Sequence, residues 1–216
     1  LRKIAIDKGL KLSEYGLFDK KTNKRVAGKT EEKLYKKLGL VYIEPELRED
    51  GGEIEAAKEN RLPKLIGYND IKGDLQMHTK WSDGSNTIEE MALAAKNLGY
   101  GYICITDHTG KLAIANALDE KRIAEQRKEI DKVNKKIKGI TVLQGVEVNI
   151  TDDGTLDMPD RVLKQLDIVV ASIHSGFKNP KEKITRRMVN AMENENVDII
   201  AHPTGRLITK RESYDI

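Results

Sequence analysis

From Asp70 onward, short apolar segments alternate with longer amphipathic ones, and this alternation restricts the possible fold more than any other feature. Segments with strand character recur five times, at 73–78, 102–106, 141–149, 168–173 and 197–201. Helical patterns follow four of them, at 87–98, 119–138, 159–165 and 181–193. Strands that alternate with helices are typical of parallel β/α units, so we predict an α/β domain with a parallel sheet.

The residues before this region have a different rhythm. The patterns predict, in order, a helix over 1–8, one strand over 12–18, a polar turn, a return strand over 25–27 and a helix over 30–39. An acidic stretch at 44–62, interrupted by proline and glycine, has the character of a linker with a short helix inside it. We therefore expect two domains, a small α+β subdomain at 1–66 and an α/β domain at 67–216.

Composition excludes several classes of protein. Hydrophobic residues make up 38% of the chain and charged residues 34%, which is typical of a soluble globular protein. No segment approaches the roughly 20 apolar residues needed to span a bilayer, so no membrane partner is expected. The single cysteine, Cys104, cannot form an internal disulfide, which suits a reducing cytoplasm. Its apolar neighbours predict a buried side chain rather than a reactive thiol.

All four histidines of the chain lie where a predicted strand ends. Glu147 lies in another strand, and Asp83 follows the first strand closely. The candidate residues are therefore His78, Asp83, His108, Glu147, His174 and His202. One histidine at a strand end is often structural, but catalytic groups of parallel β/α folds gather at this edge, so the whole set indicates a metal or catalytic site. Imidazole and carboxylate ligands together suit Zn, Mn or Fe, which can activate water for attack on a phosphate.

Basic residues could add a nucleic-acid surface. They outnumber acidic residues in 1–40, although the net charge of +3 is too small to indicate DNA binding by itself. Lys20, Lys24 and Arg25 lie at the predicted turn, and Arg206 follows the last histidine, so these four are candidate contacts to DNA phosphates. A solvated face is the more ordinary explanation of the basic excess and of the turn residues, and surface pairing with an acid explains Arg206 equally well. Trp81 could stack on a base or simply pack in the interior.

The strand-end residues also resemble the motifs of a known family, the PHP superfamily (polymerase and histidinol phosphatase). The run GDLQMHTKWSDG at 73–84 resembles its first motif, and ITDH at 105–108 resembles its second. Later motifs are resembled at 145–148, 171–175 and 200–207, the last two in the form found in family X DNA polymerases of bacteria and archaea. Residues 14–18, 27–32 and 42–48 are similar to the thumb of the same polymerases.

This resemblance implies a distorted seven-stranded β/α barrel with a cluster of metal ligands and a 3′–5′ exonuclease or related phosphodiesterase activity on DNA. The six strand-end residues named above match ligand positions of the family. The first motif of the family reads His-x-His, however, and Gln76 occupies its first position. Because an amide is a poor ligand for Zn or Mn, one metal position should be weakened. The family's final Asp-x-His pair and last strands would lie beyond Ile216, so the barrel is expected to be incomplete.

The resemblance further implies a parent DNA repair polymerase of the prokaryotic cytoplasm, with DNA as partner. Its Mg- or Mn-dependent palm would precede Leu1. Two alternatives stay open. A small-molecule phosphoesterase of the histidinol-phosphatase type would have no need of residues 1–66. A degenerate PHP domain with a structural role is favoured by Gln76.

Overall fold

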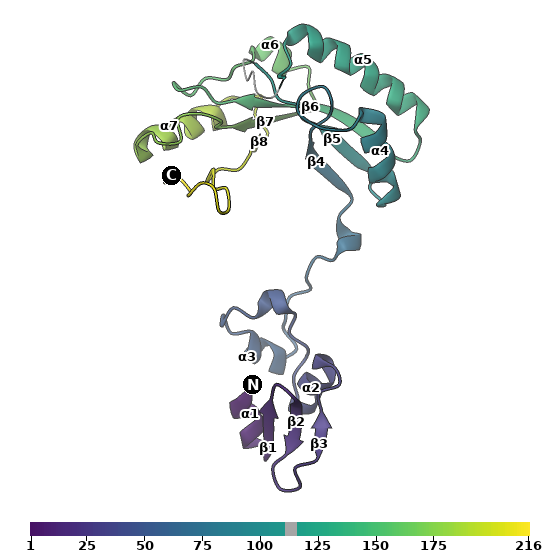
Figure 1. Cartoon of the computed structure of the whole chain (residues 1–216), viewed down its shortest axis with the longest axis vertical. Helices are drawn as coiled ribbons and strands as arrows, with labels where there is room; N and C mark the ends of the chain where they lie inside the picture. Colours follow the sequence, from purple (N-terminus) through teal and green to yellow (C-terminus); the bar gives the residue numbers. More distant parts are fainter. Residues whose placement is uncertain (111–115) are drawn as a thin grey trace. The chain divides into compact units, whose positions relative to one another are not determined.

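The computed structural model describes residues 1–110 and 116–216, and the chain divides into two compact units, Leu1–Ile66 and Gly67–Ile216 (Figure 1). The first unit contains α1 (Arg2–Asp7), β1 (Leu10–Ser13), β2 (Gly16–Asp19), β3 (Arg25–Ala27), α2 (Glu31–Leu38), the 3₁₀ turn η1 (Pro45–Leu47) and α3 (Glu53–Lys58). Its three strands form an antiparallel sheet in the order β1-β2-β3. Its core consists of Ala5, Leu17, Tyr35, Leu38, Leu40, Ile43 and Ala57.

The single strand predicted over 12–18 is wrong, because the chain turns back at Glu14 and Tyr15 and forms two strands. Ser13 pairs with Gly16 in the register of this tight turn. Gly16 has a φ of +129°, and a Cβ there would lie 2.7 Å from the carbonyl oxygen of Ala27. Only glycine tolerates that conformation and that approach, so Gly16 allows the turn and the predicted hairpin becomes a three-stranded meander.

The second unit contains the 3₁₀ turn η2 (Tyr68–Asp70), β4 (Gly73–Met77), α4 (Ile88–Asn97), β5 (Tyr102–Ile105), α5 (Glu120–Lys136), β6 (Thr141–Asn149), α6 (Asp160–Leu163), β7 (Ile168–Ser172), α7 (Lys181–Met192) and β8 (Ile199–Ile200). The five strands are all parallel and follow chain order, β4-β5-β6-β7-β8, in a curled sheet (Figure 1). The predicted α/β class is confirmed. The last strand is shorter than the predicted 197–201.

Helices α4 and α5 pack against each other and against the neighbouring strands β5 and β6 (Figure 1). Ile130 and Val133 of α5 are buried there against Ile103 and Ile105 of β5. Each buried aliphatic side chain of this kind contributes about 1.5–3 kcal/mol of hydrophobic free energy, which holds the helices against the sheet. Among the described residues, no helix combines the length and apolar character that crossing a membrane requires.

Cys104 should not react with a thiol reagent while the protein is folded. Its side chain is fully buried in β5, and burial, helped by nearby carboxylates, raises the pKa of the thiol to about 12. Thiolate is the reactive form, and at pH 8 a pKa this high leaves almost none of it. We expect negligible labelling by Ellman's reagent in buffer and one equivalent in guanidinium chloride. Rapid labelling of the native protein would contradict this packing.

Candidate metal centre

The four histidines and Glu147 converge on the edge of the sheet where the strands end. His78 directly follows β4, and His174 and His202 follow β7 and β8. His108 lies beyond β5 and forms an isolated parallel bridge with Glu147 of β6. Because the carboxyl ends of parallel strands share one edge, residues far apart in the sequence become neighbours here.

Glu147 is the centre of this group, with a side chain that is only 2% exposed. Its Oε2 lies 3.2 Å from His78 Nε2 and 3.7 Å from His108 Nδ1. Its Oε1 lies 3.2 Å from the Nε2 atoms of both His174 and His202. One buried carboxylate therefore faces all four imidazole rings.

Ionisation in this centre follows from its contacts. Burial by itself would raise the pKa of Glu147, but hydrogen bonds from His174, His202 and His78, and from the Ser172 hydroxyl, outweigh burial and hold that pKa well below its usual range. The hydrogen bond to Glu147 raises the pKa of His78, whereas burial lowers the pKa of His108. An ionised carboxylate and a neutral imidazole are the forms that bind metals.

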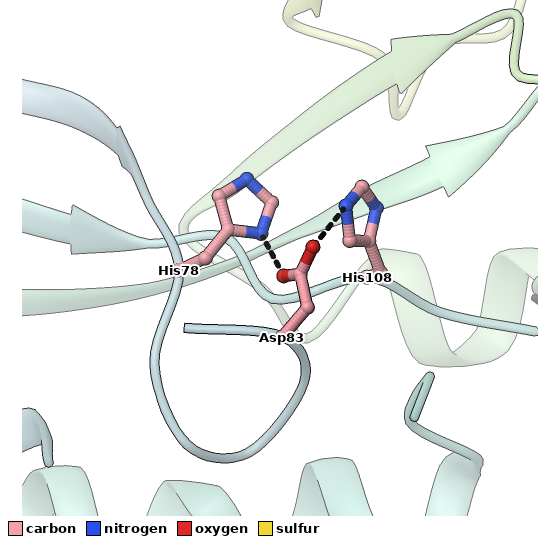
Figure 2. Close-up of side chains that lie close together, drawn as sticks. All are labelled: His78, Asp83 and His108. Carbon is pink, nitrogen blue, oxygen red and sulfur yellow. Dashed lines mark ion pairs between the residues drawn. The ribbon is translucent and has the colours of Figure 1, made fainter. Parts of the chain in front are cut away.

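Asp83 lies between two of the rings, with one carboxylate oxygen directed to each (Figure 2). Its Oδ1 is 3.5 Å from His78 Nδ1, and its Oδ2 is 3.7 Å from His108 Nε2. The His78 and His108 ring centroids are 4.5 Å apart. The side chain of Asp83 is about half exposed, so this part of the centre opens to solvent.

These contacts fit a bound divalent cation. Two ligand atoms around a tetrahedral zinc ion lie about 3.4 Å apart, close to the separations found here. His78 Nδ1 and His108 Nδ1 are buried and make no hydrogen bond within the described part of the chain. Ligand atoms gather within 4.8 Å in two groups that share one histidine, His78–Asp83–His108 and His108–Glu147–His174.

Asn149, which the sequence reasoning missed, orients His174. The Asn149 amide nitrogen donates to Asp157 and to the Thr109 carbonyl, so its oxygen faces His174 Nδ1 at 2.5 Å. That oxygen can only accept, so Nδ1 donates to it and Nε2 is the ring nitrogen that faces Glu147. Nε2 is therefore the atom of His174 that would bind a cation at this centre. The position of Asn149 at the end of β6 was the signal available in the sequence.

The other predicted residues lie as follows. Gln76 donates from its amide to Glu147 Oε2 at 3.1 Å, so the residue at this ligand position does reach the centre. Trp81 packs against the core clusters, and its indole nitrogen donates to Glu129 at 2.9 Å, which favours the packing role.

The four candidate DNA contacts are exposed. Lys20, Lys24 and Arg25 belong to the first unit and lie in or beside the segment between β2 and β3, whereas Arg206 lies in the second unit after His202. The Arg25 guanidinium donates to the Gly28 carbonyl. Within the described ranges none of the four takes part in an ion pair, so the structure leaves their positive charges available.

Comparison with known proteins agrees with this geometry. Residues 74–210, more than half of the chain, match the family model described as the PHP domain. The chain belongs to the PHP domain family. Residues 1–49 match the model described as the DNA polymerase beta thumb. The thumb match precedes the PHP match along the chain, as the resemblance to family X polymerases predicts, and the two matches support that resemblance.

Named relatives extend the comparison. The "DNA polymerase/3′-5′ exonuclease PolX" of Bacillus subtilis (strain 168) is 46% identical over 216 residues, which are 100% of this chain and 38% of that protein. A "probable phosphatase" of Thermoanaerobacter sp. (strain X514) is 40% identical over 135 residues, 60% of this chain and 53% of that protein. The chain therefore spans about two fifths to one half of these proteins.

Among solved structures, histidinol phosphate phosphatase from Lactococcus lactis subsp. lactis Il1403, complexed with Zn, L-histidinol and phosphate, matches with a TM-score of 0.44 and 18% identity. The match covers 62% of this chain and 58% of that one.

Proposed function

We propose that the chain is part of a DNA repair polymerase and that its PHP domain hydrolyses phosphodiester bonds of DNA from the 3′ end. In this proposal, residues 1–66 act as the thumb and residues 67–216 as the phosphoesterase domain. The observation that carries it is the buried Glu147 carboxylate, which lies within 3.7 Å of four histidines at the strand ends. The thumb match in the same chain favours DNA over a small phosphate ester as substrate.

The proposed metal ligands are His78, Asp83, His108, Glu147, His174 and His202, with Gln76 at a weakened position. Bound Zn, Mn or Fe would supply a polarised phosphoryl oxygen and a water of lowered pKa. The chain's own contribution is to hold the ligands. Glu147 is held by Ser172, which donates to it at 2.7 Å, and His174 is held by Asn149.

Contacts to DNA are proposed for Lys20, Lys24, Arg25 and Arg206, because exposed cations without carboxylate partners are suited to phosphates. A polymerase site using Mg or Mn would belong to a palm outside this chain. The bacterial polymerase relative favours a cytoplasmic location. Replacing any one of these four side chains by alanine should make the slope of log K for DNA binding against log salt concentration shallower by about one.

A small-molecule phosphatase is the second candidate, and one observation favours it. The probable phosphatase of Thermoanaerobacter is 40% identical to this chain, over 60% of its length. The description of that relative does not mention DNA, so the preferred substrate distinguishes the two candidate functions.

Metal content and substrate preference together test the proposal. The chain, alone and extended by the strands that the family resemblance implies, is analysed for Zn, Mn and Fe after dialysis. Each form is then incubated with 5′-labelled single-stranded DNA and with p-nitrophenyl phosphate. We expect bound metal and stepwise shortening of the DNA from its 3′ end. Cleavage of the phosphomonoester alone would favour the second candidate, and absence of metal from both forms would reject the ligand assignment.

Substituting Gln76→His should tighten metal binding. The Gln76 amide nitrogen is 3.1 Å from Glu147, so an imidazole at this position would reach the centre. We expect metal affinity to rise at least about 10-fold, a change comparable to the loss caused by removing an outer partner of a ligand. Chelator competition measures it. Gln165→His, on an exposed site after α6, is the matched control and should leave affinity unchanged. No gain from Gln76→His would show that this position lies outside the ligand set.

A further inference from the structure

Asp107 is a fully buried carboxylate beside His108 that the proposed ligand set does not use. Its Oδ1 accepts hydrogen bonds from the Thr79 backbone N–H at 2.7 Å and from the Ser82 hydroxyl at 2.6 Å. Its Oδ2 accepts from the Thr79 hydroxyl at 2.6 Å and from the Gln126 amide at 2.7 Å. Four donors thus surround one carboxylate, a number that only a carboxylate can accept on two oxygens.

Three of these donors belong to the loop that carries Asp83. The loop closes on itself, because the backbone N–H groups of Ser82 and Gly84 both donate to the Thr79 carbonyl. A Cβ at Gly84 would lie 2.4 Å from the His78 carbonyl oxygen, so the turn leaves no room for another residue. The Ser82 hydroxyl that donates to Asp107 is also 3.2 Å from Asp83 Oδ1. Asp107 therefore holds the loop next to the residue that contacts two histidines.

The hydrogen bonds around Asp107 have one possible direction. Gln126 donates to Asp107 and accepts from the Gln144 amide at 3.2 Å. The Gln144 amide also donates to the Ile123 carbonyl at 2.9 Å. The backbone N–H of Thr79 can only donate, and the Ile123 carbonyl can only accept. Neither glutamine side chain can therefore be flipped without placing two donors or two acceptors against each other. Both terminal atoms of the residue 107 side chain must therefore accept hydrogen bonds.

We propose that Asp107 is a positioning residue that fixes Asp83 between His78 and His108. The proposal rests on the metal centre of the proposed function. Asp107 acts through Thr79 and Ser82 and is itself no ligand. All four partners donate to its two oxygens, so the amide of asparagine, which brings hydrogens of its own, cannot replace it.

The test replaces one acceptor atom of residue 107 by a donor. In Asp107→Asn, the new amide nitrogen meets either the Thr79 N–H or the Gln126 amide, and both are donors. We expect metal affinity, measured by chelator competition, to fall about 10- to 100-fold, as for outer partners of metal ligands. Hydrogen exchange of the Ser82 and Gly84 amides, which needs no metal, should become faster in the same variant.

A second substitution should restore the site. When Gln126→Glu is combined with Asp107→Asn, the new carboxylate accepts from the asparagine amide on one side and from Gln144 on the other. The asparagine oxygen still accepts from Thr79. Metal affinity should then return to within about 3-fold of the wild type, less than the smallest loss typical of an outer partner. Gln126→Glu alone sets two carboxylates together and should also weaken binding.

Ile130→Val separates positioning from general destabilisation. Ile130 is fully buried in α5 and takes no part in the hydrogen bonds around Asp107. This variant should therefore lower the unfolding temperature and keep wild-type metal affinity. Ser82→Ala is a milder variant for use if Asp107→Asn does not fold, and it should weaken metal binding about 3- to 10-fold.

Wild-type affinity in Asp107→Asn, or no recovery in the double variant, would overturn the inference. So would a loss of metal in Ile130→Val equal to that in Asp107→Asn. A wild-type chain that binds metal but leaves DNA intact would reject the proposed function, whereas the affinities of the variants would still decide the role of Asp107.

Discussion

Substituting Glu147→Gln is expected to lower the metal affinity of the chain by more than about 100-fold, since even an outer partner of a ligand contributes about 10- to 100-fold. The side chain is 2% exposed and faces the nitrogen atoms of four histidines. Glutamine has the same shape, but its amide nitrogen directs hydrogens to a place where a cation requires a lone pair. Loss of metal should follow from this single exchange of an oxygen for a nitrogen.

Two measurements check this expectation. Elemental analysis after dialysis should show metal in the wild type and almost none in the variant. Hydrolysis of single-stranded DNA should fall below about 1% of the wild-type rate, in proportion to the lost metal. The matched control is Glu125→Gln, which makes the same chemical change on an exposed site of α5 and should preserve both quantities. A Glu147→Gln variant that retains all its metal would show that Glu147 is no ligand.

The metal-free protein gives an independent readout of the same substitution. The hydrogen bond to Glu147 is the largest cause of the raised pKa of His78. A raised pKa keeps this imidazole protonated to higher pH in the metal-free wild type, so removing the carboxylate should shift its titration toward lower pH. NMR titration of the His78 ring, with chelator present, measures the shift. An unchanged titration curve would contradict the short contact between the two side chains.

The sequence predicted the strand-end residues because the rule behind them is topological. Parallel strands bring their carboxyl ends to one edge whatever their side chains are, and so His78 and His202 could be placed together before any geometry was known. Asn149 lay at the same kind of position but was not selected, because an amide is an ordinary residue near a strand end. Its role depends on Asp157 and Thr109, and no sequence pattern links those partners.

Other errors have local causes. The segment over 12–18 has strand character throughout, and the turn within it depends on the close approach of Gly16 to Ala27 of another strand. The sequence does not single out Asp107 beside His108, because its hydrogen bonds reach Gln126 and, through it, Gln144, which belong to other elements of the fold. Contacts made across the fold, rather than along the chain, were therefore what the sequence could not predict.

Arg187 is the clearest case of such a contact. Arginine side chains are mostly exposed in proteins, yet Arg187 of α7 is 1% exposed. Its guanidinium donates to the carbonyls of Ile150 at 2.6 Å, Thr151 at 2.8 Å and Ser175 at 3.0 Å. It therefore joins α7 to the end of β6 and to the residue that follows His174.

Substituting Arg187→Met should destabilise the second unit by about 3–5 kcal/mol. Each hydrogen bond to a charged group contributes about 1.5–3 kcal/mol, and burial of the methionine recovers only part of the loss. For a unit of this size the unfolding temperature should fall by roughly 6–20 °C, which calorimetry measures. Arg187→Lys keeps the charge but lacks the planar fork, so its unfolding temperature should lie between those of the wild type and Arg187→Met. The matched control is Arg186→Met, at the exposed neighbouring position, which should change stability by less than about 0.5 kcal/mol. Equal stability of the two methionine variants would mean that the three carbonyls find other donors, and that α7 is held by its apolar face alone.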